Sequence, residues 1–195
     1  MTTQILIAGF GGQGVLFAGK CLAYEGMFDN KNVSWLPSYG PEMRGGTANC
    51  SVIISDESVG SPIVSTPDVL IVMNAPSLDK YENATVKNGK IFIDSTLISR
   101  EVVRKDVNAY YIPATKIAQD LGIPTLANMV IVGKMIKETG ITTLEKTCEA
   151  MKKVVSSRHQ DLLQANIKVF CATLSASSRR RLHTEALSTR FRCLL

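Results

Sequence analysis

Gln4-Ile5-Leu6-Ile7-Ala8-Gly9-Phe10-Gly11-Gly12-Gln13-Gly14 places an apolar run directly before a glycine-rich segment. Gln4–Phe10 has the composition of a buried strand, and residues 9–14 fit the pattern G-x-G-x-x-G. The residues that follow have the i, i+3, i+4 and i+7 spacing of an apolar helix face: Val15, Ala18, Gly19 and Leu22. A strand that passes through a glycine turn into a helix is typical of a Rossmann-like α/β domain.

The glycine turn is a candidate cofactor-binding element made of Gly9, Gly11, Gly12, Gln13 and Gly14. Glycines permit a tight turn and bring the backbone close to a ligand, while the free N–H groups and positive dipole end of the helix attract phosphate. The turn therefore predicts an anionic ligand. The alternative is that the glycines only tighten a strand–helix turn.

The rest of the chain alternates strands with helices. We expect strands at Val33–Leu36 (stopped by Pro37), Thr47–Ser55, Val59–Val64, Asp68–Met73, Lys90–Asp94 and Tyr110–Ile112. We expect helices from Val15 to a close at Gly26, and at Pro76–Asn83, Ala114–Leu121, Pro124–Glu138, from Leu144 onward and at Gln160–Cys171. The pattern predicts one three-layer α/β/α Rossmann-like domain with a mainly parallel sheet, made mixed by pairing of Val59–Val64 with Thr47–Ser55.

Composition limits the classes of function. The chain has 195 residues, 45% of them hydrophobic, which suits one compact domain. Apolar runs are far too short for a membrane span, and no secretory signal precedes the first strand, so we expect a cytoplasmic protein. Five scattered cysteines without a C-x-x-C pair, and only two histidines, argue against disulfides, iron–sulfur clusters and any metal site in this chain.

The net charge of +5 is concentrated at the C-terminal end. From Ala172 onward there are five arginines against Glu185, so residues 1–171 are nearly neutral and give no sign of nucleic-acid binding. We predict a folded domain over 1–171 and a basic, Arg- and Ser-rich tail over 172–195, either disordered or a non-native product of a shifted reading frame. The alternative is an ordinary basic extension.

A second loop rich in special residues runs from Ser38 to Gly46 and follows the second strand, beside the glycine turn. Its candidate cofactor-binding residues are Ser38, Tyr39, Arg44, Gly45 and Gly46. Arg44 offers a planar fork of donors for a phosphate or carboxylate. The alternative roles are a structural contact of Arg44 with Glu42 or with backbone, and packing for Tyr39 and Trp35.

No nucleophile with a base is recognisable, so no catalytic residue is assigned. Cys21 and Cys50 are expected to be inert packing groups, and Asp94-Ser95-Thr96 a helix or turn cap. A dinucleotide site would need an acidic residue after the second strand, but Asp29 precedes that strand. The lack of an acidic residue after the second strand counts against NAD as the ligand of the glycine turn.

Taken together, four segments resemble the gamma subunit of 2-oxoacid:ferredoxin oxidoreductases, which corresponds to one domain of single-chain pyruvate:ferredoxin oxidoreductases. They are Ile7–Gly14, Ser38–Ala48, Gly60–Ile63 and Asp68–Asn74. The resemblance covers about residues 3–170, and Arg44–Thr47 is more similar to the 2-oxoglutarate and 2-oxoisovalerate types than to the pyruvate type.

The resemblance implies a heteromeric enzyme that converts a 2-oxoacid and coenzyme A to acyl-CoA and CO2, with ferredoxin as electron acceptor. Thiamine diphosphate and iron–sulfur clusters would belong to partner alpha, beta and delta subunits. This chain would supply subunit contacts and possible coenzyme A binding, and would be inactive alone. The open alternatives are a free-standing NAD- or flavin-dependent oxidoreductase and a non-catalytic interaction module.

Overall fold

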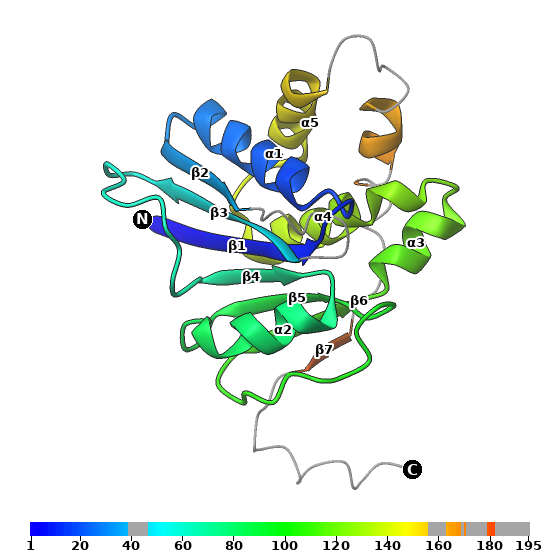
Figure 1. Ribbon diagram of the computed structural model, residues 1–195. Coiled ribbons are helices and arrows are strands. Elements are labelled where there is room, and N and C mark those ends of the chain that lie inside the picture. Colours follow the sequence, from blue (N-terminus) through cyan, green and yellow to red (C-terminus); the bar gives the residue numbers. More distant parts are fainter. Residues whose placement is uncertain (39–46, 156–162, 169, 171–178, 182–195) are drawn as a thin grey trace, which may run out of the picture.

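The computed structural model describes residues 1–38, 47–155, 163–168, 170 and 179–181, which form one mixed sheet flanked by helices (Figure 1). In sheet order the strands are β2 (Asn32–Ser38), β3 (Thr47–Ser55), β1 (Thr2–Phe10), β4 (Val69–Val72), β5 (Lys90–Asp94), β6 (Asn108–Ile112) and β7 (Arg179–Arg181). The helices are α1 (Val15–Phe28), α2 (Ala75–Tyr81), α3 (Ala114–Asp120), α4 (Ala127–Thr139) and α5 (Leu144–Val154). Short 3-10 turns occur at Glu82–Ala84 and Pro124–Leu126, and residues 163–168 are also helical.

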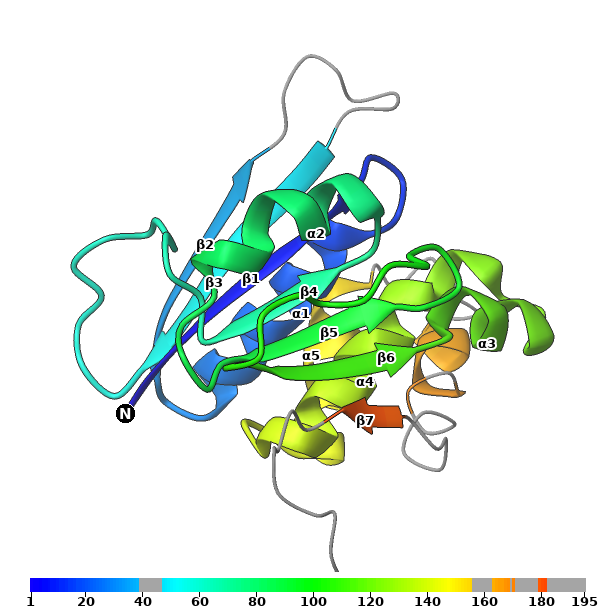
Figure 2. The same ribbon diagram turned by 90° about the horizontal axis from the view of Figure 1, so that it is seen from below.

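Helices lie on both faces of the sheet (Figures 1 and 2). On the face covered by α1, α4 and α5, Ile5 and Ile7 belong to one large cluster of buried apolar side chains. On the α2 face, Leu6, Leu70 and Ile91 belong to a second cluster that includes residues of the connecting loops. The two clusters separated by a sheet confirm the predicted three-layer α/β/α Rossmann-like domain.

The sheet is mixed for a reason other than the predicted one. β1, β4, β5 and β6 are parallel neighbours, whereas β3 runs antiparallel between β1 and β2. The expected strand at Val59–Val64 is wrong, since residues 56–68 contain no strand. This segment instead folds over the α2 face, where Val64 is buried and its N–H donates to Ser51 Oγ at 3.4 Å.

Two predicted element ends are also wrong. β2 runs through Pro37 to Ser38, because β2 is an edge strand, where a residue without an N–H is tolerated. α1 runs through Gly26 to Phe28, and Gly26 is a packing residue: a Cβ there would lie 2.8 Å from Val33 Cγ2. The glycine therefore lets the helix approach β2 closely rather than ending it.

The C-terminal residues are described only in part. Arg179–Arg181 pair antiparallel with β6 as strand β7, which differs from the expectation of a tail free of the fold at these three positions. The other residues from 172 onward lie outside the described ranges, and the boundary at 171 stays a prediction. Within the described ranges, no helix has both the length and the apolar character to cross a membrane.

Candidate functional site

The glycine turn joins the end of β1 to the start of α1 and leaves the helix start open. Gly12 and Gly14 have φ values of 93° and 72°, a left-handed backbone that favours glycine. Gly14 is the N-cap of α1 and gives no side-chain cap, and the first turn of the helix contains no acidic residue. Gly11 and Gly12 are exposed. The arrangement offers uncapped N–H groups and a positive helix end to an anion.

Gln13 holds the turn from inside. Its Oε1 accepts a hydrogen bond from Phe10 N at 2.6 Å, and its Nε2 donates to Met73 O at 2.9 Å, directly after β4. A Cβ at Gly9 would lie 2.6 Å from Gln13 Oε1. Gly9 and Gln13 therefore fix the turn against β4, which is a packing role for at least these two members of the motif.

Asn128, on α4, holds the turn from the other side, and it was not among the residues predicted from the sequence. Its Nδ2 donates to Gly14 O at 3.0 Å, and the side chain is buried. Because 114 positions separate the two residues, no local pattern could have paired them. A polar residue in the mainly apolar first half of a helix was the one available signal.

The described strand ends that flank the second candidate loop lie at the same sheet edge as the glycine turn. Ser38 ends β2 and pairs with Asn49, which in turn pairs with Ala8 of β1. Phe10, at the entry to the glycine turn, pairs with Thr47 at the start of β3. Ser38 and Thr47, which bound the second candidate loop, therefore lie at the sheet edge that carries the glycine turn. Tyr39, Arg44, Gly45 and Gly46 lie outside the described residues.

Other polar groups at this edge cap helices. Asp94, at the end of β5, accepts hydrogen bonds from Thr96 N at 3.0 Å and from Thr115 N in the first turn of α3. Thr96 Oγ1 accepts from Lys116 N. Asn74 caps α2 through Ser77 N at 2.8 Å. The predicted capping role of Asp94–Thr96 is thus confirmed.

Within its described residues, β2 carries no acidic side chain at the end where a dinucleotide ribose would need one. β2 ends in Ser38, whereas Asp29 is the C-cap of α1 and forms an ion pair with Lys146 of α5. Asp29 also lines a cavity of about 460 Å³ at the opposite edge, together with residues such as Lys31, Asp56 and Lys90. Asp29 therefore lies away from the sheet edge at which a dinucleotide ribose would bind.

The buried thiols are poor nucleophiles. Burial raises the pKa of Cys21 far above its ordinary value, and burial also raises the pKa of Cys50 to about 12. Cys50 Sγ instead donates to Val15 O at 3.4 Å. In the described part of the chain, no three His, Cys, Asp or Glu residues gather in a way that could hold a metal ion.

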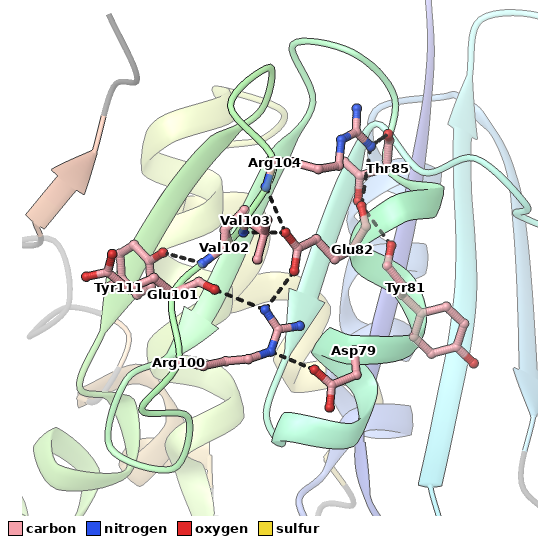
Figure 3. Close-up of polar contacts among 10 residues, drawn as sticks. All are labelled: Asp79, Tyr81, Glu82, Thr85, Arg100, Glu101, Val102, Val103, Arg104 and Tyr111. Carbon is pink, nitrogen blue, oxygen red and sulfur yellow. Dashed lines mark hydrogen bonds and ion pairs between the residues drawn. The ribbon is translucent and has the colours of Figure 1, made fainter.

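A polar cluster away from the glycine turn fastens the loop between β5 and β6 to α2 (Figure 3). The buried carboxylate of Glu82 accepts hydrogen bonds from Arg100 Nη1 at 2.7 Å, Val103 N at 2.6 Å and Arg104 N at 3.0 Å. Burial alone would raise the pKa of Glu82, but these donors together lower it. Both oxygens of the Glu82 carboxylate accept hydrogen bonds from within the fold, so the cluster has a structural role.

Residues 4–176 match the family model described as pyruvate ferredoxin/flavodoxin oxidoreductase. The ketoisovalerate oxidoreductase subunit VorA of Methanothermobacter thermautotrophicus is 41% identical over 168 residues, which are 85% of this chain but 34% of the relative. The chain thus spans about a third of the length of that relative.

Two further proteins are similar over most of their own length. The 2-oxoglutarate synthase subunit KorC of Methanocaldococcus jannaschii is 36% identical, with 77% of this chain and 82% of the relative covered. The crystal structure of the keto/oxoacid ferredoxin oxidoreductase gamma subunit from Geobacter sulfurreducens has a TM-score of 0.74 at 28% identity, covering 88% of this chain and 95% of that one.

Proposed function

Because the chain belongs to the pyruvate ferredoxin/flavodoxin oxidoreductase family, we propose that it is the gamma component of a multisubunit 2-oxoacid:ferredoxin oxidoreductase. The observation that carries this proposal is the similarity to KorC and to the Geobacter gamma subunit over nearly their whole lengths. The assembly would oxidatively decarboxylate a 2-oxoacid to acyl-CoA and CO2, in the cytoplasm. The chain itself would be inactive alone, because the thiamine diphosphate and the iron–sulfur clusters would belong to its partner subunits.

The proposed substrate is 2-oxoglutarate first, then 2-oxoisovalerate, then pyruvate. Some relatives are named for 2-oxoglutarate and others for ketoisovalerate, and both names support a 2-oxoacid as the substrate. Alpha and beta subunits, a delta ferredoxin-like subunit and ferredoxin are the proposed partners. They would carry the thiamine diphosphate and the iron–sulfur clusters.

The proposed role of the glycine turn and of Arg44 is to hold coenzyme A at the contact with the alpha and beta subunits. Coenzyme A has a diphosphate and a ribose phosphate, which suit an uncapped helix start and an arginine fork. The open start of α1, with no acidic residue in its first turn, supports this role. When bound, coenzyme A supplies the thiol that accepts the acyl group, and this chain's part is to orient it.

A second candidate is an interaction module that binds partner chains but no nucleotide. The observation in its favour is that Gly9 and Gln13 serve close packing of the turn against β4. A free-standing NAD or flavin enzyme is the weaker alternative, because Asp29 lies at the opposite edge. Thermal-shift scans of the purified chain with NAD and with coenzyme A separate these candidates.

The deciding experiment is a tagged chain purified gently from its native host and assayed for coenzyme A-dependent reduction of viologen dye. The three 2-oxoacids are tested in parallel, and larger chains are expected to co-purify with activity. A lone, inactive chain from active cells would contradict the subunit role.

Arg44→Ala in the assembled enzyme is expected to raise the KM for coenzyme A at least several-fold, with little change in the KM for the 2-oxoacid. Lys153→Ala is the matched control, because it also removes one positive charge, at an exposed position on α5. An unchanged KM for coenzyme A in Arg44→Ala would leave the interaction module as the better description.

A further inference from the structure

Asn128 is a buried amide among the mainly apolar residues that begin α4. It is the second residue of α4, whose residues 127–136 are all buried, and its own side chain is 3% exposed. The Nδ2 atom donates to Gly14 O at 3.0 Å, while Oδ1 is buried and has no hydrogen-bond partner among the described residues. A buried carbonyl oxygen without a donor costs free energy.

An apolar side chain of the same shape would avoid that cost. The position is therefore not explained by packing or by stability, and the hydrogen bond to Gly14 is the part of Asn128 that an apolar residue could not supply. A residue that costs stability and contacts a candidate site is typical of a functional constraint.

The contact acts on the residue that starts α1. Gly14 O accepts from Ala18 N at 3.0 Å as well as from Asn128 Nδ2, so Asn128 fixes the first helical turn against α4. A Cβ at Gly14 would lie 2.5 Å from Nδ2, which shows how closely the two residues meet. Gln13 ties the other side of the turn to β4 through Met73.

We propose that Asn128 is a positioning residue for the glycine turn: it sets the direction of the uncapped N–H groups at the start of α1 and thereby the affinity of the turn for the phosphates of a bound ligand. This inference rests on the proposed function, because the ligand is taken to be coenzyme A. Asn128 does not touch the ligand in this role. It acts through Gly14.

Asn128→Leu in the assembled enzyme is the decisive variant, because leucine has a similar shape and removes both the hydrogen bond and the unpartnered oxygen. We expect a melting temperature equal to or above that of the wild type, and a KM for coenzyme A raised about five-fold, the equivalent of one lost hydrogen bond. kcat is expected to stay within about two-fold, because the chemistry takes place elsewhere. Hydrogen exchange in the peptide covering residues 9–18 is expected to become faster.

Val130→Ala is the control for loss of packing in the same helix, since Val130 is fully buried two residues further along. It is expected to lower the melting temperature and leave the KM for coenzyme A unchanged. If Asn128→Leu fails to assemble, Asn128→Ser, which is smaller and too short to reach Gly14 O, is measured with the same readouts.

The outcomes separate this inference from the proposed function. A raised KM in both Asn128→Leu and Arg44→Ala supports both. A raised KM in Arg44→Ala alone, with unchanged exchange at residues 9–18 in Asn128→Leu, overturns the inference and leaves the coenzyme A role standing. An unchanged KM in both variants contradicts the coenzyme A role and the inference that rests on it.

Discussion

Gln13 Nε2 donates a hydrogen bond to Met73 O at 2.9 Å and so joins the turn after β1 to the residue that follows β4. The same side chain accepts from Phe10 N at 2.6 Å, within its own turn. One carboxamide thus satisfies a donor at the end of β1 and an acceptor after β4, and so anchors the turn to both strands. The backbone groups that face outward can then serve a ligand without rearrangement.

Gln13→Ala is expected to lower the free energy of unfolding by about 1–2 kcal/mol, because two main-chain groups lose their partner. It is also expected to raise the KM for coenzyme A, since the turn becomes less ordered. Chemical denaturation and steady-state kinetics measure the two effects. Gln119→Ala, an exposed glutamine on α3, is the control and is expected to change neither.

Gly19 lets α1 pack closely against β3. A Cβ there would overlap Cys50 Sγ and lie 3.1 Å from Trp35 Nε1. Gly19→Ala is therefore expected to destabilise the fold by about 1–3 kcal/mol, despite the higher helix propensity of alanine. Thermal unfolding measures the loss.

The double variant Gly19→Ala with Cys50→Ala tests the cause, because it removes the sulfur that the new methyl group meets. The cost of Gly19→Ala is expected to shrink in the Cys50→Ala background, giving a coupling energy of at least about 0.5 kcal/mol. Gly60→Ala, where a Cβ would meet nothing within 4 Å, is the neutral control. Equal costs of Gly19→Ala in both backgrounds would mean that the overlap is relieved elsewhere.

Local sequence pattern was sufficient for most elements, although not for the expected strand at Val59–Val64, and it was not sufficient for the element ends. The glycine motif predicted β1, the turn and α1, and the apolar spacing from Leu144 predicted α5, whose observed N-cap is Thr143. The ends predicted for β2 at Pro37 and for α1 at Gly26 were wrong, because the effect of a proline or a glycine depends on which elements pack beside it. A proline is tolerated at a sheet edge, and a glycine within a helix can serve a close contact. Neither condition is visible in a stretch of sequence.

In the candidate site, too, the contacts between residues far apart in the chain could not be predicted from the sequence. Gln13 was identified as part of a motif, but its bond to Met73 depends on β4 being the neighbour of β1. Asn128 was missed because α4 must first pack beside α1 before its amide can meet Gly14. Contacts between residues far apart in the chain arise from topology, which a single sequence does not display.

Glu82 is expected to stabilise the fold only when it is ionised. Its pKa is lowered because hydrogen bonds from Arg104, Arg100 and Val103 outweigh its burial, so its contribution is present above the ordinary value near 4.5 and is lost as pH falls through the lowered value. Glu82→Gln is expected to cost about 2–4 kcal/mol at neutral pH, with a smaller difference from wild type in acid. Asp79→Asn, which removes the charge of an exposed partner of Arg100, is expected to cost less than about 1 kcal/mol.

Glu25 is expected to have the opposite pH dependence. Its carboxyl lies buried in α1 at the contact with α5, where the facing Thr147 hydroxyl donates to Thr143 O rather than to the carboxyl. Both carboxyl oxygens lack a hydrogen-bond partner among the described residues. Burial raises the pKa of Glu25 to about 8, and the nearby charge of Asp29 adds to the effect.

The folded state therefore holds the Glu25 proton up to about pH 8, whereas the unfolded chain releases it near the ordinary pKa of 4.5. Stability is expected to fall as pH rises from about 5 to 8, by an amount on the order of a few kcal/mol. Glu25→Gln keeps the shape without the charge, so it should match the wild type near pH 5 and exceed it near pH 9. Denaturation curves at both values measure this, with the exposed Glu145→Gln as control. A wild-type stability that is flat between pH 5 and 9 would show that Glu25 is ionised and paired in the folded protein.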